Sequence, residues 1–126
     1  RWLEKLQLGE FAARRLSELS GGEQKGAHLA MAFAALPEPF DGALLLDEPA
    51  AALDLGRQEA VRQAIADFAH AGAACVVATH DLAFARRCDR LLVLAEGRLV
   101  AAGEPASALT PEVISDVWGE PASPGR

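Results

Sequence analysis

Apolar and polar residues follow two different periods along the chain, and these periods predict helices and strands in turn. Residues 27–36 and 55–69 repeat apolar side chains with a helical period. Residues 43–46 and 74–78 are continuously apolar, as expected of strands buried on both faces of a parallel sheet. The order strand, helix, strand therefore predicts an α/β fold with a mostly parallel sheet and flanking helices.

Capping residues set the expected limits of the two longer helices. Ser20 and Glu23 have the spacing of a capping box, so a helix is predicted to begin there and to end before Pro37. Asp54 is a favourable N-cap for the next helix, which Gly72 is expected to end.

The two ends of the chain predict shorter elements. Residues 2–19 indicate two short helical pieces separated at Gly9, and a further helix follows residue 81. Residues 91–94 and 99–101 flank a turn, which predicts a β-hairpin near the C-terminal end. Thr110 is expected to cap a last short helix. We expect residues 1–120 to form one partial domain and residues 121–126 to be a frayed tail.

Composition and charge restrict the classes of function. The 126 residues are 51% hydrophobic and carry a formal net charge of −6, which disfavours binding to nucleic acid. The longest apolar runs are shorter than the stretch of roughly 18 residues that crosses a bilayer. The two cysteines are too few for a disulfide framework. A basic nucleic-acid binder and a membrane-spanning protein are therefore not expected.

The start of the first long helix is the first candidate for chemistry. Gly21 and Gly22 follow Ser20 directly, although each glycine in a helix costs about 1 kcal/mol relative to alanine. Bare backbone at a helix N-terminus allows a phosphate to approach the free N–H groups. The alternative is a capping box without a ligand, and these residues alone do not decide between the two.

Paired carboxylates follow the first predicted strand. Asp47 and Glu48 lie at its carboxyl end, where open α/β sheets bind their ligands. Asp47 could hold Mg²⁺ through water while Glu48 polarises an attacking water molecule. The alternative is a polar turn, which we consider less favoured at this position.

His80 ends the second buried strand and so shares the same predicted edge. A histidine alone is more often structural than catalytic, but this one is expected beside Asp47 and Glu48. His28 and His70 have no metal-ligand spacing to each other or to the cysteines. No zinc site is predicted.

These motifs, taken in order, resemble those of the ATP-binding cassette (ABC) ATPases. They are LSGGEQ at residues 19–24, LLLDEP at 44–49 with AALD at 51–54, and VVATHD at 76–81. The resemblance implies the carboxyl-terminal part of a P-loop NTPase domain. The ending from Leu109 to Gly119 is similar to that of importer ATPases for haem, iron-siderophores and cobalamin.

The resemblance also implies a role for each motif. Glu48 and His80 would be catalytic, and Asp47 would bind Mg²⁺ through water. The LSGGEQ signature would contact ATP held by the opposite subunit of a head-to-tail dimer, with the 51–54 motif as the D-loop. The nucleotide-binding residues would be Ser20, Gly21, Gly22, Gln24 and Asp54.

The sequence departs from the family pattern at several positions. It contains no G-x-x-x-x-G-K-[ST] phosphate loop, which the family places upstream of these motifs. Gly26 and Met31 stand where the signature helix usually has arginines, and Ala51 stands in the D-loop where the family has serine. We therefore expect a fragment that, isolated, binds Mg-ATP weakly and does not hydrolyse it.

The sequence predicts an ATP-hydrolysing subunit of an importer for haem, an iron-siderophore or a related solute. It would bind permease subunits at the cytoplasmic face of the cell membrane as a peripheral protein, and a solute-binding protein would act indirectly. A degenerate cassette that only pairs with an active partner, and the ATPase head of a repair or chromosome-maintenance protein, remain as alternatives. The solute and the permease are not specified by the sequence.

Overall fold

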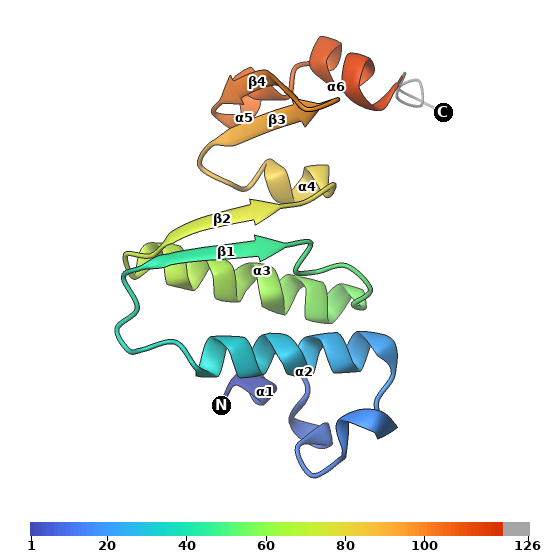
Figure 1. Ribbon diagram of the computed structural model, residues 1–126, viewed down its shortest axis with the longest axis vertical. Helices are drawn as coiled ribbons and strands as arrows, with labels where there is room; N and C mark the ends of the chain where they lie inside the picture. Colours follow the sequence, from blue (N-terminus) through green and yellow to red (C-terminus); the bar gives the residue numbers. More distant parts are fainter. Residues whose placement is uncertain (120–126) are drawn as a thin grey trace. The chain divides into compact units, whose positions relative to one another are not determined.

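A computed structural model describes residues 1–119, so the predicted tail lies outside the described residues. The described chain forms two compact units, of which the first is Arg1–His80 and the second begins at Asp81. All the candidate residues named above lie in the first unit. Figure 1 shows the helices and strands of both units.

The first unit begins with short helical turns that lead into a long helix. The turns are α1 (Trp2–Lys5), η1 (Gly9–Phe11) and η2 (Leu16–Glu18), so there are three pieces where two were predicted. The long helix is α2 (Gly21–Ala34), which begins at the predicted cap and ends before Pro37.

A parallel pair of strands follows, joined by a helix as predicted. Strand β1 (Ala43–Asp47) pairs in parallel with β2 (Ala74–Ala78), and Leu45 lies opposite Val76. Helix α3 (Leu55–His70) connects them and lies along the pair (Figure 1). The parallel crossover brings the carboxyl ends of both strands to one edge, which is where the candidate site lies.

The two faces of this sheet differ in burial, although the continuous apolar sequence of both strands is of the type that is buried on both faces. One face is half-buried, and on it the Cys75 Sγ atom lies 3.8 Å from the Ile65 carbonyl oxygen of α3. The opposite face is open, since Leu45 is 74% exposed and Val76 is 59% exposed. Both residues are large and apolar, so this face has the composition of a surface that packs against further protein.

Aromatic and aliphatic side chains form the core of the first unit. The rings of Trp2 and Phe33 lie 5.2 Å apart, and the Trp2 and Phe68 rings stack at 5.3 Å. Fully buried residues include Leu6, Leu8, Phe33 and Val61. This core joins the first turns to α2 and α3, and so it fixes the elements that carry the candidate site.

The second unit contains the predicted hairpin with helices around it. Helix α4 (Leu82–Ala85) precedes β3 (Leu91–Ala95) and β4 (Arg98–Gly103), which pair antiparallel around a turn with positive φ at Glu96 and Gly97. Helix α6 (Pro111–Trp118) begins at the predicted Thr110 cap. Helix α5 (Pro105–Ala108) was not predicted, because it is a single turn that has no side-chain cap.

The core of the second unit lies between the hairpin and its helices. Its buried residues are Val93, Ala108 and Leu109, and partly buried side chains from α4 and α6 pack against them. Over residues 1–119, none of the helices has the length and apolar character needed to cross a membrane.

Candidate functional site

The beginning of α2 is held by a complete capping box. The Ser20 hydroxyl oxygen accepts a hydrogen bond from the Glu23 amide at 3.1 Å, and the Glu23 carboxylate accepts one from the Ser20 amide at 3.0 Å. A hydroxyl that accepts in this way can still donate its own proton. Capping and ligand contact by Ser20 are therefore compatible, although the sequence analysis treated them as alternatives.

The two glycines of this turn differ in their surroundings. A Cβ atom on Gly22 would lie 2.4 Å from the carbonyl oxygen of Ala52, whereas a Cβ atom on Gly21 would meet nothing within 4 Å. Glycine is thus required at position 22 because the Ala52 backbone packs closely against it. Only Gly21 leaves open space beside the helix N-terminus.

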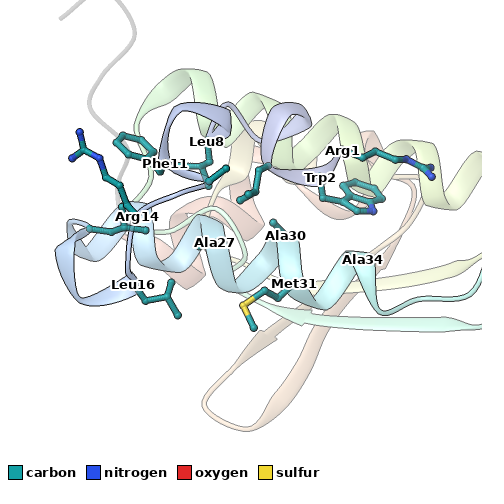
Figure 2. Close-up of a pocket in the computed structure, with 13 residues that line it drawn as sticks. Arg1, Trp2, Leu8, Phe11, Arg14, Leu16, Ala27, Ala30, Met31 and Ala34 are labelled. Atoms are coloured by element: carbon teal, nitrogen blue, oxygen red, sulfur yellow. The ribbon is translucent and has the colours of Figure 1, made fainter.

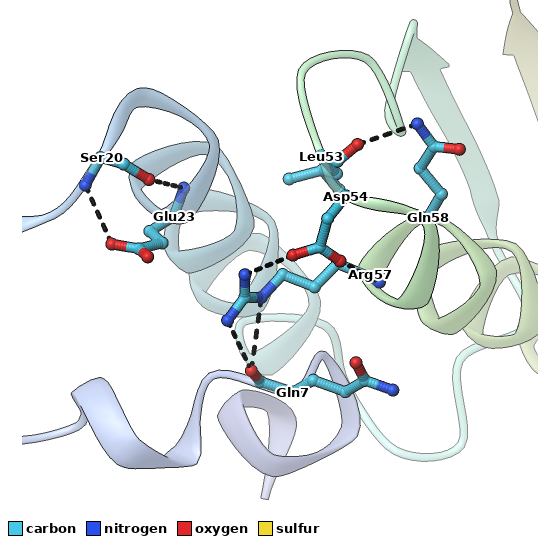
Figure 3. A network of polar contacts seen from close by, with 7 residues as sticks. All are labelled: Gln7, Ser20, Glu23, Leu53, Asp54, Arg57 and Gln58. Atoms are coloured by element: carbon cyan, nitrogen blue, oxygen red, sulfur yellow. Dashed lines mark hydrogen bonds and ion pairs between the residues drawn. The ribbon is translucent and has the colours of Figure 1, made fainter.

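A cavity of about 270 Å³ lies where the start of α2 faces the loop that precedes α3. Figure 3 shows the polar residues around it, drawn from both elements. The cavity is lined by Ser20, Gly22, Glu23, Ala52, Leu53, Asp54 and Arg57. The structure thus brings together three of the predicted nucleotide contacts, namely Ser20, Gly22 and Asp54.

Gln24 takes a different position from these three residues. Its side-chain amide donates to the carbonyl oxygen of Leu19 at 3.1 Å, within the same turn. Gln24 is not among the residues that line the cavity. In this structure its amide therefore supports the backbone just before the helix.

Asp54 caps α3 as the sequence predicted. Its carboxylate accepts from the Arg57 amide at 2.9 Å and pairs with the Arg57 guanidinium at 2.6 Å (Figure 3). Gln58 supports the same turn by donating to the Leu53 carbonyl oxygen at 2.9 Å. The end of the 51–54 motif is consequently ordered by two side chains of α3.

Glu48 lies immediately beyond β1 in a constrained backbone conformation. Its φ angle is 46°, which is uncommon for a residue other than glycine. Its amide donates to the Ala78 carbonyl oxygen at 2.7 Å, and its carbonyl oxygen accepts from the Lys25 ammonium. These bonds hold the Glu48 backbone between β2 and α2.

The Glu48 side chain points to the end of β2. One carboxylate oxygen accepts from the His80 amide at 2.8 Å and contacts His80 Nδ1, and the other accepts from the Thr79 hydroxyl at 3.3 Å. The hydrogen bond from the His80 side chain lowers the pKa of the Glu48 carboxyl. Partial burial opposes this shift, while the His80 amide and the Thr79 hydroxyl add to it. Glu48 is therefore ionised at neutral pH and positioned beside an imidazole that is 89% exposed.

Asp47 ends β1 at the same edge, opposite Ala78 of β2. Its side chain is exposed, and it is the neighbour of Glu48 in sequence. Residues 1–119 contain no group of three or more His, Cys, Asp or Glu side chains that could hold a metal ion. A single exposed carboxylate fits Mg²⁺, because that ion keeps several of its waters and takes its other ligands from phosphates.

The chain is similar to known proteins in sequence and in fold. The family model described as "AAA domain, putative AbiEii toxin, Type IV TA system" matches residues 2–86, more than half of the chain. The hemin import ATP-binding protein HmuV of Myxococcus xanthus is 45% identical over 113 residues, which are 86% of this chain and 42% of the relative. The HmuV of Deinococcus radiodurans is 40% identical over 93% of this chain and 46% of its own length.

Solved structures show the same fold. "An inward-facing conformation of a putative metal-chelate type ABC transporter" matches 92% of this chain and 45% of that chain, with a TM-score of 0.71 and 28% identity. The chain belongs to the AAA-domain family of the matching model, and it is similar to hemin import ATP-binding proteins and to ABC transporter structures. It spans less than half of the length of these relatives.

A second ABC structure supports the fold alone. An ATP-binding cassette of an ABC transporter matches 93% of this chain and 47% of that chain, with a TM-score of 0.69 and 23% identity. The predicted fold class, an α/β P-loop NTPase part with a parallel sheet and a hairpin, is confirmed.

Gly26, a departure from the ABC pattern, has a structural explanation that the sequence did not reveal. A Cβ atom on Gly26 would lie 2.6 Å from the Cδ1 atom of Leu8, which is completely buried. Gly26 in α2 therefore admits the Leu8 side chain. Met31, the second departure in this helix, is 60% exposed.

Sequence reasoning missed several residues that support the cassette motifs. Lys25 binds the Glu48 carbonyl oxygen, Thr79 binds the Glu48 carboxylate, and Arg57 binds Asp54. The position of Thr79 next to His80 was the only sequence signal for its role. Lys25 and Arg57 are charged residues on helices, where most such side chains are solvated, so no pattern distinguished them.

A second, mostly apolar cavity of about 370 Å³ lies along α2 (Figure 2), and Leu19 of the 19–24 motif is one of its lining residues. It is lined by α2 on one side and by the first helical turns on the other. Trp2, Leu8, Phe11, Leu16 and Met31 are among the lining residues.

Proposed function

We propose that the complete protein is the ATP-hydrolysing subunit of an ABC importer for haem or a related iron solute. The observation that carries the ATPase assignment is the Glu48 carboxylate held beside His80 at the carboxyl edge of the parallel strands. The relatives named hemin import ATP-binding protein support the choice of solute. We also propose that residues 1–120 form one partial cassette domain.

Ser20 would bind a terminal phosphate of ATP held by a second, head-to-tail subunit. Its oxygen accepts from the Glu23 amide, so its proton remains available for a phosphate oxygen. The open space beside Gly21 leaves room for the phosphate at the positive end of the helix dipole. Gly22 and Gln24 would support this contact, and Asp54 would complete it from the facing loop.

Glu48 would orient and polarise the attacking water molecule. Its carboxylate is ionised and has defined hydrogen bonds, which fix the direction in which it accepts a proton. His80, whose ring is exposed, would contact the γ-phosphate. Asp47 would hold Mg²⁺ through water, and the bound ion would neutralise charge on the phosphates.

The permease subunits would lie in the membrane and this subunit at its cytoplasmic face, as a peripheral protein. A solute-binding protein would act on the permease and not on this chain. The alternative of a degenerate cassette loses part of its support, because close packing against Leu8 accounts for glycine at position 26. Retention of Glu48 and His80 in mutual contact also favours an active enzyme.

The test uses a complete ATPase that contains this chain. The part of the M. xanthus relative that precedes its matched region is joined to residues 1–126, and the chimera replaces that relative in a haemin-import strain. We expect Mg-dependent ATP hydrolysis and haemin-dependent growth. Hydrolysis without haemin uptake would reject the solute assignment, and a chimera that folds and binds ATP without hydrolysing it would reject the enzyme assignment.

A further inference from the structure

The Arg57 side chain connects the Asp54 carboxylate to the segment that follows α1. Its Nη1 atom lies 2.6 Å from an Asp54 carboxylate oxygen, and its Nε and Nη2 atoms donate to the Gln7 carbonyl oxygen at 3.3 and 3.1 Å. Figure 3 shows the guanidinium between these two partners. The Arg57 side chain is only 16% exposed, whereas that of Asp54 is 56% exposed. The bridge is thus largely covered while the carboxylate remains accessible.

The partner at the far end of this bridge is also fixed. Gln7 has a φ angle of 61°, and its carbonyl oxygen is the acceptor for both guanidinium nitrogens. Beneath the guanidinium, the Phe11 ring centroid lies 5.6 Å from Arg57 Cζ. Gly56 approaches the same turn so closely that a Cβ atom there would lie 2.8 Å from the Gln7 side-chain oxygen. The start of α3 is therefore docked on the segment that follows α1.

The bridge depends on the shape of the guanidinium. A planar group with several fixed donors can bind a carboxylate on one side and a carbonyl oxygen on the other. A lysine ammonium at the same position has a single charged nitrogen on a flexible stem and cannot span both acceptors in this way. The Arg57 backbone amide caps onto Asp54 independently of the side chain, at 2.9 Å.

We infer that Arg57 is a positioning residue that fixes the Asp54 carboxylate against the Gln7 segment for its contact with nucleotide across the dimer. This inference rests on the proposed function, since it assigns a role to Asp54 as a nucleotide-binding residue. Glu48 is anchored separately, through Lys25 and the His80 amide. Loss of the Arg57 bridge should therefore weaken nucleotide binding and leave the chemical step intact.

The experiment compares Arg57→Met, Arg57→Lys and Arg14→Met in the complete chimeric ATPase. Arg14 is the matched control, because its guanidinium carbon also lies over the Phe11 ring, at 5.5 Å from the centroid, and within residues 1–119 it makes no hydrogen bond or ion pair with Asp54 or Gln7. KM for ATP, kcat, ATP-dependent dimerisation and melting temperature are measured for each variant.

For Arg57→Met we expect KM for ATP to rise about tenfold, which corresponds to about 1.4 kcal/mol. We expect kcat within about twofold of the unsubstituted chimera, and dimerisation that needs correspondingly more ATP. Arg57→Lys should keep most of this defect, and Arg14→Met should show none of it. Asp54→Asn with Arg57→Met should be no worse than Asp54→Asn alone, because both remove the same interaction.

Equal KM in Arg57→Met and Arg14→Met would overturn the inference, as would full activity in Arg57→Lys. An additive effect of the two substitutions at positions 54 and 57 would also overturn it, because Arg57 would then act independently of Asp54. These results differ from failure of the proposed function, in which the unsubstituted chimera itself would neither hydrolyse ATP nor dimerise with it.

Discussion

Gly22 and Ala52 lie so close together that a Cβ atom on Gly22 would come within 2.4 Å of the Ala52 carbonyl oxygen. The contact joins the first turn of α2 to the loop between β1 and α3. That loop begins at Glu48, whose carbonyl oxygen is itself bound by Lys25 of α2. The first turn of α2 and the loop after β1 are therefore held together by direct contacts.

Alanine substitutions separate packing from ligand contact at the two glycines. Gly22→Ala should lower the free energy of unfolding by about 1–3 kcal/mol, because the rigid backbone oxygen of Ala52 must move. Gly21→Ala should leave it unchanged or raise it by up to about 1 kcal/mol, but it should weaken ATP-dependent dimerisation, since its methyl group enters the open space proposed for the phosphate. Denaturant unfolding measures the stability of both variants, and a dimerisation assay measures their response to ATP. Equal stability of the two variants would contradict the packing argument.

The contact between Gly26 and Leu8 predicts a compensating pair. Gly26→Ala should destabilise the protein by about 1–3 kcal/mol through overpacking, in spite of a helix-propensity gain of about 1 kcal/mol. Leu8→Ala alone should cost about 2–5 kcal/mol. The double variant should be more stable than the sum of the two losses predicts, as measured by a double-mutant cycle. Strict additivity would show that the two positions do not interact.

The depressed pKa of Glu48 predicts a pH-dependent contribution to stability. The contribution is complete above the usual glutamate pKa of 4.5 and is lost as the pH falls through the lower folded-state pKa. Glu48→Gln should therefore be less stable than the unsubstituted protein at neutral pH, and the difference should disappear in acid. Unfolding from pH 7 to pH 3 in magnesium-free buffer measures it. A difference that persists unchanged at pH 3 would show that the carboxylate charge is not its cause.

Ser20→Asp tests the ligand contact at the signature turn. Aspartate is as good an N-cap as serine, so the free energy of unfolding should change by less than about 1 kcal/mol. A carboxylate facing the γ-phosphate of the partner's ATP should nevertheless prevent ATP-driven dimerisation. Melting temperature and light scattering with ATP measure the two effects. Normal dimerisation by a folded variant would leave Ser20 as a cap only.

Much of the local structure followed from sequence because the signals are local. The Ser20 capping box, the Asp54 cap and the strand at residues 74–78 all lie where they were predicted. Each depends on residues within one turn or one strand. The same holds for the edge position of Glu48 and His80, which parallel pairing alone requires.

Long-range packing was not predictable in this way. Nothing in the local sequence shows that Gly26 faces Leu8 or that Arg57 reaches Gln7, because these partners are distant along the chain. The local sequence also does not show which face of β1 and β2 is open. Its continuous apolar sequence indicates burial, but Leu45 and Val76 have no covering element among residues 1–119.

The assignment of Glu48 as the residue that activates water is the central claim, and one substitution tests it most directly. ATP binding and ATP hydrolysis are measured for Glu48→Gln in the complete chimeric ATPase, beside the unsubstituted protein. The amide is nearly isosteric with the carboxylate but is a poor proton acceptor. We expect hydrolysis to be nearly abolished while ATP binding and ATP-dependent dimerisation are retained. Hydrolysis close to the unsubstituted rate would contradict the assignment of Glu48.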